Sequence, residues 1–562
     1  MKINFAFRPR LVECLKQYTV AQFRADLIAG ITVGIVALPL AMAFGIASGV
    51  TPEAGLFTAV VAGFIISALG GSRVQIGGPT GAFIVIVFGI LAEYGAVNLA
   101  ICTMMAGVIL FIMGFARLGS AIKFIPYPVT MGFTSGIAVL IFSTQVKDFL
   151  GLQVDKLPAE FVEKLIALGG ALDTLDGPTL ALAGGSLLIM LLWPRKWSRA
   201  VPGSIVALVA GTLAVALFKL PVETIGTRFG GIPEGLPPLQ IPEISLSTLG
   251  SLIQPATTIA LLAAIESLLS AVVADGMIDD RHDSNQELMA QGIANIASPL
   301  FGGIAATGAI ARTATNVKSG GRTPVAGIIH ALTLLVILLV AAPLAKSIPL
   351  ATLSAVLVKV AINMGEWHHF KRLLKWPRSD AAVFLTAFAL TVLIDLTVAV
   401  EVGMVLAAIL FIKRLADTTQ VTAVDPTNDT EGVQHSLSGK DIPEEVQVFR
   451  IFGPFFFGVA DRLETALKRA EREPRVVVLR MRKVNVMDAT GLNALEDLYE
   501  KLQLHHRHLI LSALQPQPYQ VLEKAGFLAQ LGSENVCTDI DSALTRAKAI
   551  LAETPAHAAH SH

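Results

Sequence analysis

Apolar runs separated by short polar breaks follow one another from residue 25 to residue 415. A helix needs about 20 apolar residues to cross a bilayer, so each long run predicts a membrane span. The long runs lie at residues 25–47, 53–70, 97–115, 128–147, 178–193, 201–218, 255–274, 324–345 and 381–415. Weaker stretches, with more Gly and polar residues, lie at 80–92, 285–300, 308–318 and 349–363. The run 381–415 has room for two helices with a turn near Asp395 and Glu401, so the pattern predicts an α-helical membrane protein with fourteen transmembrane segments.

Basic residues in the breaks give the predicted spans an orientation, because cytoplasmic loops are enriched in Lys and Arg. With the N-terminus inside, the loops expected in the cytoplasm are the more basic ones; they hold Arg73, Arg117, Lys123, Arg195, Lys196, Arg199, Arg281, Lys318, Arg322, Lys371, Arg372, Lys375, Arg378, Lys413 and Arg414. An even number of spans returns the chain to the same side. We therefore expect a multi-pass protein of the cell (inner) membrane, surrounded by lipid, with both termini in the cytoplasm.

Residues 1–24 are basic and amphipathic and contain no short apolar core followed by a small-residue cleavage site. This pattern predicts an interfacial helix before the first span rather than a cleaved signal peptide.

The composition limits the class of protein. Of the 562 residues, 53% are hydrophobic and 15% are charged, whereas charged residues make up about a quarter of a soluble domain. Lys plus Arg and Asp plus Glu both number 43, so net charge gives no reason to expect a nucleic-acid partner. The three cysteines are far apart and predict neither a disulfide framework nor a metal cluster; they are Cys14, Cys102 and Cys537. We expect no enzyme, no metal and no cofactor, because the sequence shows no nucleophile–base arrangement and no phosphate-binding loop.

Two of the weak segments resemble each other. Thr80-Gly81-Ala82-Phe83 is similar to Thr307-Gly308-Ala309-Ile310, and the same number of residues separates Pro39 from Thr80 and Glu266 from Thr307. Seven predicted spans precede residue 255 and seven follow it, so two such repeats insert in opposite orientations. The pattern predicts two inverted repeats, at about 25–218 and 255–415. Short, glycine-interrupted segments at matching positions indicate the binding site of a transporter.

Such a pair of segments favours an anion. A half-helix that starts inside the membrane presents unpaired N–H groups and the positive end of its dipole. Two half-helices that meet at the midplane form an anion site from backbone alone, and small residues let the ligand approach. We expect Thr80 and Thr307 to cap these helices or to donate a hydroxyl to the ligand. The candidate substrate-binding residues are Thr80, Gly81, Ala82, Phe83, Thr307, Gly308, Ala309, Ile310 and Arg312.

Two charges fall inside predicted spans and need an explanation. Arg312 either attracts the anion, or forms a structural ion pair, or extends to the membrane edge beside Lys318. Glu266 and Ser270 lie one helical turn apart on the same face. Glu266 can carry a coupling proton; with Ser270 it can instead help to hold Na⁺, or it can be the fixed partner of Arg312.

The chain changes character after Arg414. Residues 416–440 are polar and lack an apolar period, which predicts a linker. VQVFRIFG, RVVVLRM and HLILSAL predict buried strands, and FFFGVADRLETALKRAERE, GLNALEDLYEKLQLHH and PYQVLEKAGFLAQ predict helices. Residues 441–552 therefore form a small α/β domain. The tail 553–562 is expected to be disordered.

Three stretches carry a resemblance to a known family: DLIAGITVGIVALPLAMAFGIASGV, GLFTAVVAGFIISALGGSRVQIGGPTGAF and IESLLSAVVADGMIDDRHDSNQELMAQGIANIASPLFGGIAATGAIARTATN. Over nearly its whole length, the chain resembles a bacterial member of the sulphate permease (SulP) anion-transporter family. Within that family it is most similar to the proton-dependent C4-dicarboxylate transporters. The resemblance implies a core domain that moves against a gate domain by elevator-like alternating access, with the substrate between the third and tenth segments.

The resemblance also implies roles for single residues. Arg312 matches the basic position of many anion-carrying relatives, and Glu266 and Ser270 match the acidic and hydroxyl positions of the eighth segment. In a sodium-driven bicarbonate branch the acidic position belongs to the sodium site and the arginine is absent. Because the charge of Arg312 disfavours a nearby cation, we expect proton coupling before Na⁺ coupling. Leu40 follows Pro39 where relatives often carry a polar or acidic residue, so the first segment is not expected to add a polar group.

The C-terminal domain resembles the STAS domain, which is related to anti-sigma-factor antagonists. Asp488-Ala489-Thr490-Gly491-Leu492 follows a strand and opens a helix. In the antagonists a serine after the Asp is phosphorylated; here that position is Ala489, so we expect no such switch. Thr490 is expected to be a helix cap. The domain is expected to serve homodimer contacts, regulation or a cytoplasmic protein partner.

These observations predict a secondary active anion transporter. The expected reaction is proton-coupled symport of a dicarboxylate, sulphate or bicarbonate. A sodium-coupled bicarbonate symporter and an anion exchanger or channel of the same fold are the alternatives.

Overall fold

The computed structural model describes residues 7–553 except for short gaps at 121–125, 155–156, 159, 195–200, 232–238, 244–245, 366, 395, 425–436, 438, 457–461, 463–464 and 467–473. The chain forms two compact units, Met1–Ala407 and Ala408–His562, and each is described by itself. The predicted disordered tail and most of the predicted helix FFFGVADRLETALKRAERE lie outside the described residues.

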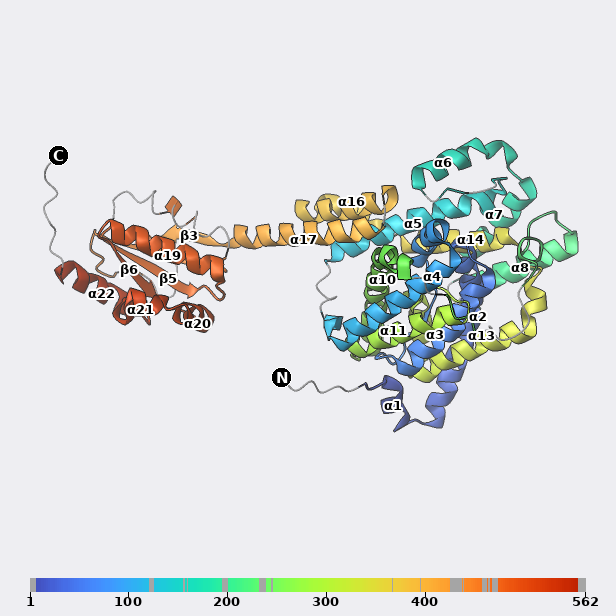
Figure 1. The fold of residues 1–562 in the computed structure, drawn as a ribbon, viewed down its shortest axis with the longest axis horizontal. Helices are drawn as coiled ribbons and strands as arrows, with labels where there is room; N and C mark the ends of the chain where they lie inside the picture. Colours follow the sequence, from blue (N-terminus) through green and yellow to red (C-terminus); the bar gives the residue numbers. More distant parts are fainter. Residues whose placement is uncertain are drawn as a thin grey trace. The chain divides into compact units, whose positions relative to one another are not determined.

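The first unit is helical (Figure 1). Its helices are α1 (Arg10–Leu15), α2 (Val20–Ala47), α3 (Pro52–Leu69), α4 (Phe83–Phe115), α5 (Tyr127–Leu150), α6 (Phe161–Gly170), α7 (Gly177–Leu192), α8 (Gly203–Phe218), α9 (Ile225–Phe229), α10 (Leu246–Ile278), α11 (Ser284–Leu300), α12 (Ile310–Lys318), α13 (Pro324–Ala345), α14 (Leu350–Met364), α15 (His368–Arg372) and α16 (Arg378–Leu393). α17 (Leu396–Thr418) begins in the first unit and ends in the second. The predicted apolar runs fall on these helices, and the run 381–415 divides between α16 and α17. Glu401, which we expected in a turn, lies within α17, and Asp395 lies outside the described residues.

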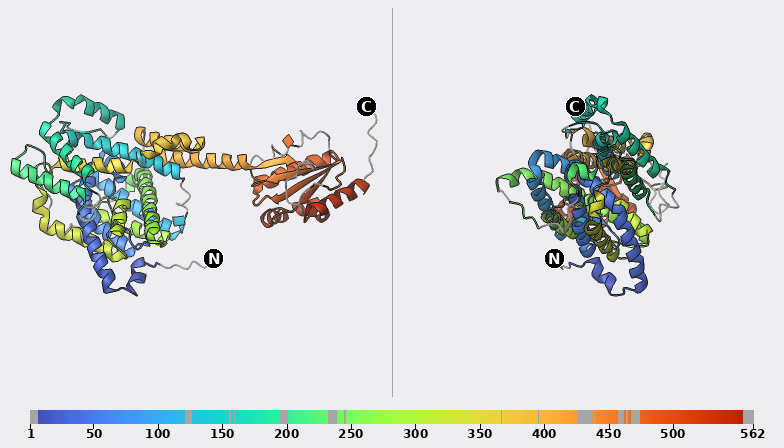
Figure 2. Two further views of the ribbon diagram at one scale, coloured as in Figure 1. Left: turned by 180° about the vertical axis from the view of Figure 1, so that it is seen from behind. Right: turned by 90° about the vertical axis from the view of Figure 1, so that its right-hand side faces the viewer.

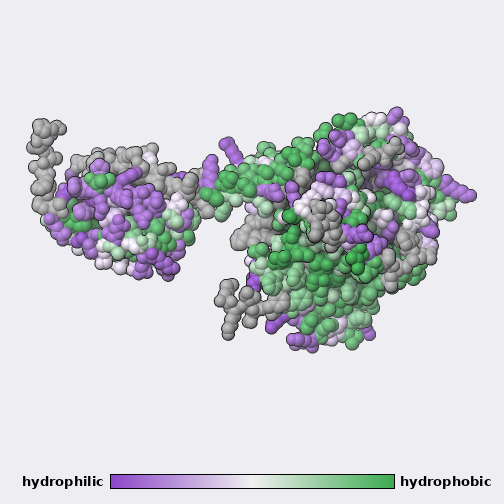
Figure 3. Space-filling model, viewed as in Figure 1, coloured by the Kyte–Doolittle hydropathy of each residue, from purple (hydrophilic) through white to green (hydrophobic). Residues whose placement is uncertain are grey.

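Length and composition allow several of the described helices to cross a membrane. Five qualify outright: Val20–Ala47, Pro52–Leu69, Phe83–Phe115, Tyr127–Leu150 and Thr248–Ile278. Apolar residues cover much of the visible surface of the first unit (Figure 3). Those exposed on α7, α8 and α13 include Leu188, Leu192, Val209, Leu213, Leu217, Val336, Val340 and Leu344. An apolar surface of this extent indicates contact with lipid.

Helix α4 contains two predicted segments joined at a break. Gly95 has φ 81° and ψ 173°, outside the helical region. A positive φ costs glycine little because it has no Cβ, and the chain changes direction there. The residues before the break match the weak segment 80–92, and those after it match the run 97–115. The predicted total of fourteen segments depends on counting these parts separately.

Glycine lets α4 and α11 approach until their backbones touch. A Cβ on Gly107 would lie 2.6 Å from the carbonyl oxygen of Gly292, and a Cβ on Gly292 would lie 2.6 Å from the carbonyl oxygen of Gly107. Close approach of this kind is how helices associate in a membrane, where apolar burial offers little driving force.

We expect Gly107→Ala to lower the stability of the detergent-solubilised protein by about 1–3 kcal/mol, because the added methyl group forces α4 and α11 apart. The thermal unfolding midpoint measures this change. Gly185→Ala on α7 is the matched control, since a Cβ there meets nothing within 4 Å. Equal midpoints for the two variants would contradict the proposed contact.

The second unit is a five-stranded sheet in the order β3-β4-β5-β6-β7. Its strands are β3 (Gln420–Ala423), β4 (Val446–Phe452), β5 (Val476–Lys483), β6 (His508–Ser512) and β7 (Val536–Cys537). β3 pairs antiparallel with β4 and the other neighbours are parallel. The helices are α19 (Ala489–Leu504), α20 (Pro516–Lys524), α21 (Phe527–Leu531) and α22 (Ile540–Glu553). They cover both faces of the sheet (Figures 1 and 2).

Alternation along β5 explains this two-sided packing. Val477 and Leu479 join the core beneath α19 and α20, whereas Val476 and Val478 join the core beneath α22. Successive side chains of a strand point to opposite faces, so an uninterrupted apolar strand is buried on both.

Two expectations about this region need correction. The predicted linker 416–440 begins with the end of α17 and the strand β3, whose residues are exposed except for the half-buried Val421, as suits an edge strand. Its position beside β4 could not be recognised from a short polar segment alone. At the start of α19 the helix cap is Asp488, whose carboxylate accepts a hydrogen bond from Gly491 N at 2.8 Å, and not Thr490.

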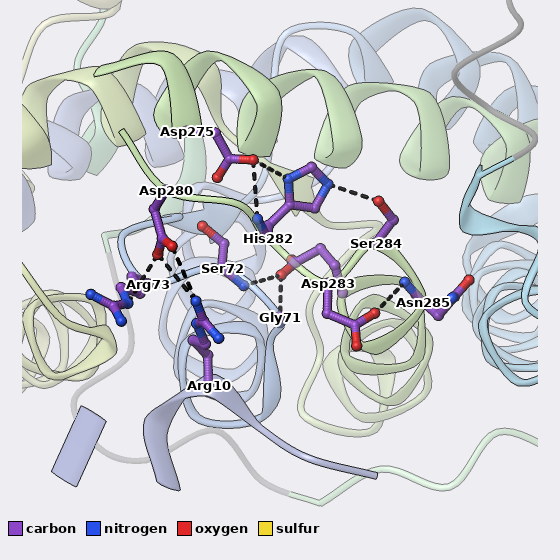
Figure 4. A network of polar contacts seen from close by, with 11 residues as sticks. Arg10, Gly71, Ser72, Arg73, Asp275, Asp280, His282, Asp283, Ser284 and Asn285 are labelled. Atoms are coloured by element: carbon purple, nitrogen blue, oxygen red, sulfur yellow. Dashed lines mark hydrogen bonds and ion pairs between the residues drawn. The ribbon is translucent and has the colours of Figure 1, made fainter. Parts of the chain in front are cut away.

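A polar network joins α1, the segment after α3 and the α10–α11 connection (Figure 4). Asp280 pairs with Arg10 at 3.1 Å and with Arg73 at 2.9 Å. Glu287 Oε2 accepts hydrogen bonds from Gly71 N and Ser72 N. The predicted N-terminal segment 1–24 therefore contains a short helix attached to loops of the same unit, and α2 begins before residue 25.

Charge holds this network together. Burial alone would raise the pKa of Asp280, but the backbone N–H of Arg281 and the guanidinium groups of Arg73 and Arg10 hold it below its ordinary value. A lowered pKa means that the ionised carboxylate stabilises the fold above its ordinary titration range and that this contribution is lost as the pH falls.

We expect Asp280→Asn to speed hydrogen exchange of the α1 amides by about fivefold, because part-exposed ion pairs contribute up to about 1 kcal/mol. Exchange measured by mass spectrometry at neutral pH tests this. Asp279→Asn is the control; Asp279 is exposed and has φ 53°, which asparagine tolerates. If α1 exchanges at the same rate in all three proteins, the ion pairs do not hold it.

Candidate functional site

The matching segments of the two repeats meet as a short antiparallel ribbon. β1 (Gly77–Gly78) pairs with β2 (Thr307–Gly308), with Gly77 opposite Gly308 and Gly78 opposite Thr307. Helix α4 begins shortly after β1, and α12 begins shortly after β2. The strands are antiparallel, so the two helices leave the ribbon from opposite ends. The first N–H groups of each helix have no partner within the helix, and both N-termini carry a positive dipole end.

Glycine is required where the ribbon touches its neighbours. Gly78 has φ 147°, and a Cβ there would lie 2.6 Å from Arg312 Nη1. A Cβ on Gly308 would lie 1.9 Å from Gln75 Nε2. Small residues therefore bring the backbone of each strand against a polar side chain.

Gly81 lies where the half-helix of α4 meets other helices. A Cβ on it would lie 3.0 Å from Ile141 of α5, 3.5 Å from Phe44 of α2 and 3.7 Å from Met364 of α14. Sequence reasoning did not identify these three apolar neighbours, because no local signal links them to the Thr-Gly-Ala motif.

The threonines of the motif do not cap the half-helices, contrary to our expectation. The N-cap residues are Ala82 and Ala309, whose side chains form no capping hydrogen bond. Thr80 Oγ1 instead donates to Glu266 Oε2 at 2.8 Å, and Thr307 Oγ1 donates to the carbonyl oxygen of Ala263 at 2.8 Å. Both hydroxyls therefore face α10.

Arg312 is almost completely buried, with 2% of its surface exposed. Its Nη2 donates to the carbonyl oxygen of Pro79, and its Nη1 has no hydrogen-bond partner among the described residues. No ion pair joins it to Glu266 in the part of the chain that the structure describes. The side chain turns inward to the ribbon, whereas Lys318 is exposed. In this geometry the guanidinium group of Arg312 keeps an unused N–H donor, at Nη1, for a ligand.

Glu266 and Ser270 have different partners. Glu266 is half-buried and accepts the hydrogen bond of Thr80. Ser270 is fully buried and donates to Thr313 Oγ1 at 3.1 Å, and Thr313 also accepts from Ile76 N at 3.0 Å. Ser270 thus joins α10 to α12. Thr313 was missed from the sequence, although it follows Arg312 directly.

The other motif residues differ in how much of their surface is exposed. Gly81, Ala82, Phe83, Gly308 and Ala309 are buried. Ile310 is 42% exposed, and Thr80 and Glu266 are half-buried. The described residues contain no group of His, Cys, Asp or Glu side chains placed to hold a metal ion. The available chemistry is therefore that of backbone dipoles, a guanidinium group, hydroxyls and one carboxylate.

A helical membrane unit with two half-helices that converge on a buried arginine defines a membrane transporter of anions. Comparison with known proteins agrees. Residues 23–387 match the Sulfate permease family, and residues 440–543 match the STAS domain. The chain belongs to the sulfate permease family, and it is a transporter and not an enzyme.

Two curated relatives span almost the whole chain. YvdB of Bacillus subtilis (strain 168), which carries a provisional sulfate-transporter name, is 43% identical and covers 92% of this chain and 97% of its own length. The bicarbonate transporter BicA of Picosynechococcus sp. (strain ATCC 27264 / PCC 7002 / PR-6) is 34% identical over 93% of this chain and 94% of its own length.

Solved structures support the fold. The transmembrane domain of a cyanobacterial BicA has a TM-score of 0.62 at 34% identity and covers 70% of this chain and 98% of that structure. SLC26A9 has a TM-score of 0.85 at 17% identity and covers 97% of this chain and 93% of that structure, which supports the fold alone. The predicted helical transporter fold with a C-terminal STAS domain is confirmed; the resemblance to the dicarboxylate branch is not.

Proposed function

We propose that the protein imports a small oxyanion in symport with protons, and that sulfate is the first candidate. The name of YvdB supports sulfate, and the name of BicA supports bicarbonate as the second candidate. Dicarboxylates remain candidate substrates, because a site built from backbone N–H groups recognises the charge and size of an anion. The protein would act in the inner membrane with both termini in the cytoplasm.

The single observation that carries this proposal is the buried guanidinium group of Arg312 beside the ribbon. A cationic group this far from solvent raises the local concentration of anions and strengthens their hydrogen bonds. Its unpartnered Nη1 and the N-termini of α4 and α12 would together hold the oxyanion. The substrate-binding set is the motif residues 80–83 and 307–310 with Arg312.

Glu266 is the proposed proton carrier. It is a half-buried carboxylate within the membrane unit, and Thr80 links it to the first half-helix. Protonation would remove the negative charge that opposes an anion beside Arg312 and would convert a hydrogen-bond acceptor into a donor. Anion and proton would then favour each other's binding, which is the linkage that symport needs.

Two groups of packed helices would supply the movement. α2, α3, α4, α10, α11, α12 and α13 pack on one another, and α5, α7, α14 and α16 do the same. Gly81 lies where the groups meet, against Ile141 and Met364. We propose that the first group, the core domain, carries the anion past the second group, the gate domain. The STAS domain would serve homodimer contacts or bind a cytoplasmic partner.

A sodium-coupled bicarbonate symporter is the second candidate. It is favoured by the similarity to BicA and by the half-buried Glu266. The neighbouring charge of Arg312 and the engagement of Ser270 with Thr313 argue against a cation site there.

Flux into proteoliposomes tests the proposal. Purified protein is supplied with sulfate, bicarbonate, succinate, fumarate or aspartate while proton and sodium gradients are varied separately. We expect saturable sulfate uptake that an inwardly directed proton gradient accelerates and a sodium gradient does not. Acceleration by sodium alone would support the second candidate, and non-saturable flux would support a channel.

A further inference from the structure

Helix α3 presents small residues at successive turns, and buried polar groups lie beside them. Ala59 lies near Gly78, next to Arg312 Nη1. One turn on, Gly63 lies beside the carbonyl oxygen of Gly77 and the ring of His330. His330 is on α13, so it reaches the ribbon from a different helix than Arg312 does. Four residues of helix rise about 6 Å, so Ala59 and Gly63 lie about that far apart along α3.

The side chains of His330 and Ser67 make no hydrogen bond of normal geometry to another described residue, although the backbone of Gly327 lies near the His330 ring. His330 is 0% exposed, and neither of its ring nitrogens has a hydrogen-bond partner among the described residues. The hydroxyl of Ser67, one further turn along α3, is likewise buried and unpartnered within that part of the chain, and it lies against Gly327 of α13. Buried polar groups without protein partners are usually hydrated.

Burial away from water is the main factor that opposes a proton on His330, and the charge of Arg312 on α12 opposes it further. On the helices packed against α13, Asp26 of α2 accepts hydrogen bonds from Tyr18 and Thr323 near the helix start, and Glu53 lies in the first turn of α3. With no anion bound, a proton on His330 would place two cations close together away from bulk water. An anion on Arg312 would remove that repulsion.

We propose that His330 binds a second coupling proton when an anion occupies Arg312. This inference rests on the proposed function, in which Glu266 binds the first. A nitrogen of the imidazole gains the proton from water on one side of the membrane and returns it to water on the other side after the anion leaves. A divalent anion would then cross with its charge neutralised.

The proton-to-sulfate ratio tests the proposal. Luminal pH and labelled sulfate are recorded together in proteoliposomes that contain the full-length protein. We expect about two protons per sulfate for the unmodified protein and about one for His330→Asn. His505→Asn, which changes an exposed histidine of the second unit, should keep the ratio of the unmodified protein. His330→Gln repeats the test if His330→Asn does not fold.

The outcomes separate this inference from the proposed function. Glu266→Gln should also give about one proton per sulfate, so loss of one proton in each variant supports both claims. An unchanged ratio in the His330 variants with a lowered ratio in Glu266→Gln overturns the role of His330 and leaves proton symport standing. Sulfate uptake without proton movement in the unmodified protein overturns both.

Discussion

Arg312→Ala is expected to raise the half-saturation concentration for the transported anion by about 100-fold, since hydrogen bonds to a charged group contribute about 1.5–3 kcal/mol. The variant removes the buried cation beside the ribbon and leaves the N-termini of α4 and α12 in place. Maximal flux should fall less than affinity does, because those backbone donors remain. Initial rates of labelled-anion uptake over a wide concentration range measure both quantities.

Lys318→Ala is the matched control for Arg312→Ala. It removes a cation from the same helix, α12, but from an exposed position away from the ribbon. Its half-saturation should equal that of the unmodified protein. The structural alternative for Arg312 predicts the opposite pattern: a collapsed melting temperature with an unchanged half-saturation in Arg312→Ala would show that the arginine serves folding through Pro79.

Glu266→Gln is expected to weaken the acceleration of uptake by a proton gradient, because one of the two proposed proton sites is lost, while anion exchange across the membrane persists. Glutamine keeps the shape of the carboxyl group and can still accept the hydrogen bond of Thr80, but it cannot bind a proton. We expect gradient-driven accumulation to fall at least about tenfold. Labelled-anion uptake with and without an imposed pH gradient gives the comparison.

Glu401→Gln supplies the control, since Glu401 is an exposed carboxylate on another helix of the membrane unit. It should retain the full response to the gradient. If Glu266→Gln also retains that response, Glu266 is not the coupling group and the proton must bind elsewhere.

Local sequence patterns predicted the helices of the membrane unit well, because long apolar runs reflect the bilayer directly. The two Thr-Gly-Ala motifs also predicted that their segments would meet, and β1, just before the first motif, pairs with β2, at the start of the second. The polar partners of the motif were not predictable. Thr80 contacts Glu266 only because the repeats interlock, and nothing near Thr80 in the sequence signals this.

Contacts between helices decide what the sequence left open. We expected Thr80 and Thr307 either to cap helices, as threonine at a helix start usually does, or to donate a hydroxyl to the ligand. Neither residue caps a helix, and both hydroxyls donate to groups of α10. Ser270 has the right helical spacing from Glu266, and its hydroxyl donates across helices to Thr313. His330 escaped attention because a single histidine in an apolar helix has no local pattern.

The position of a bound anion tests the central claim most directly. Selenate has the charge and nearly the shape of sulfate, and its selenium can be located by anomalous scattering in crystals of the full-length protein. We expect one selenium peak between the N-termini of α4 and α12, with a selenate oxygen within hydrogen-bond distance of Arg312 Nη1. A peak elsewhere in the membrane unit, with Arg312 bound only to Pro79, would contradict it.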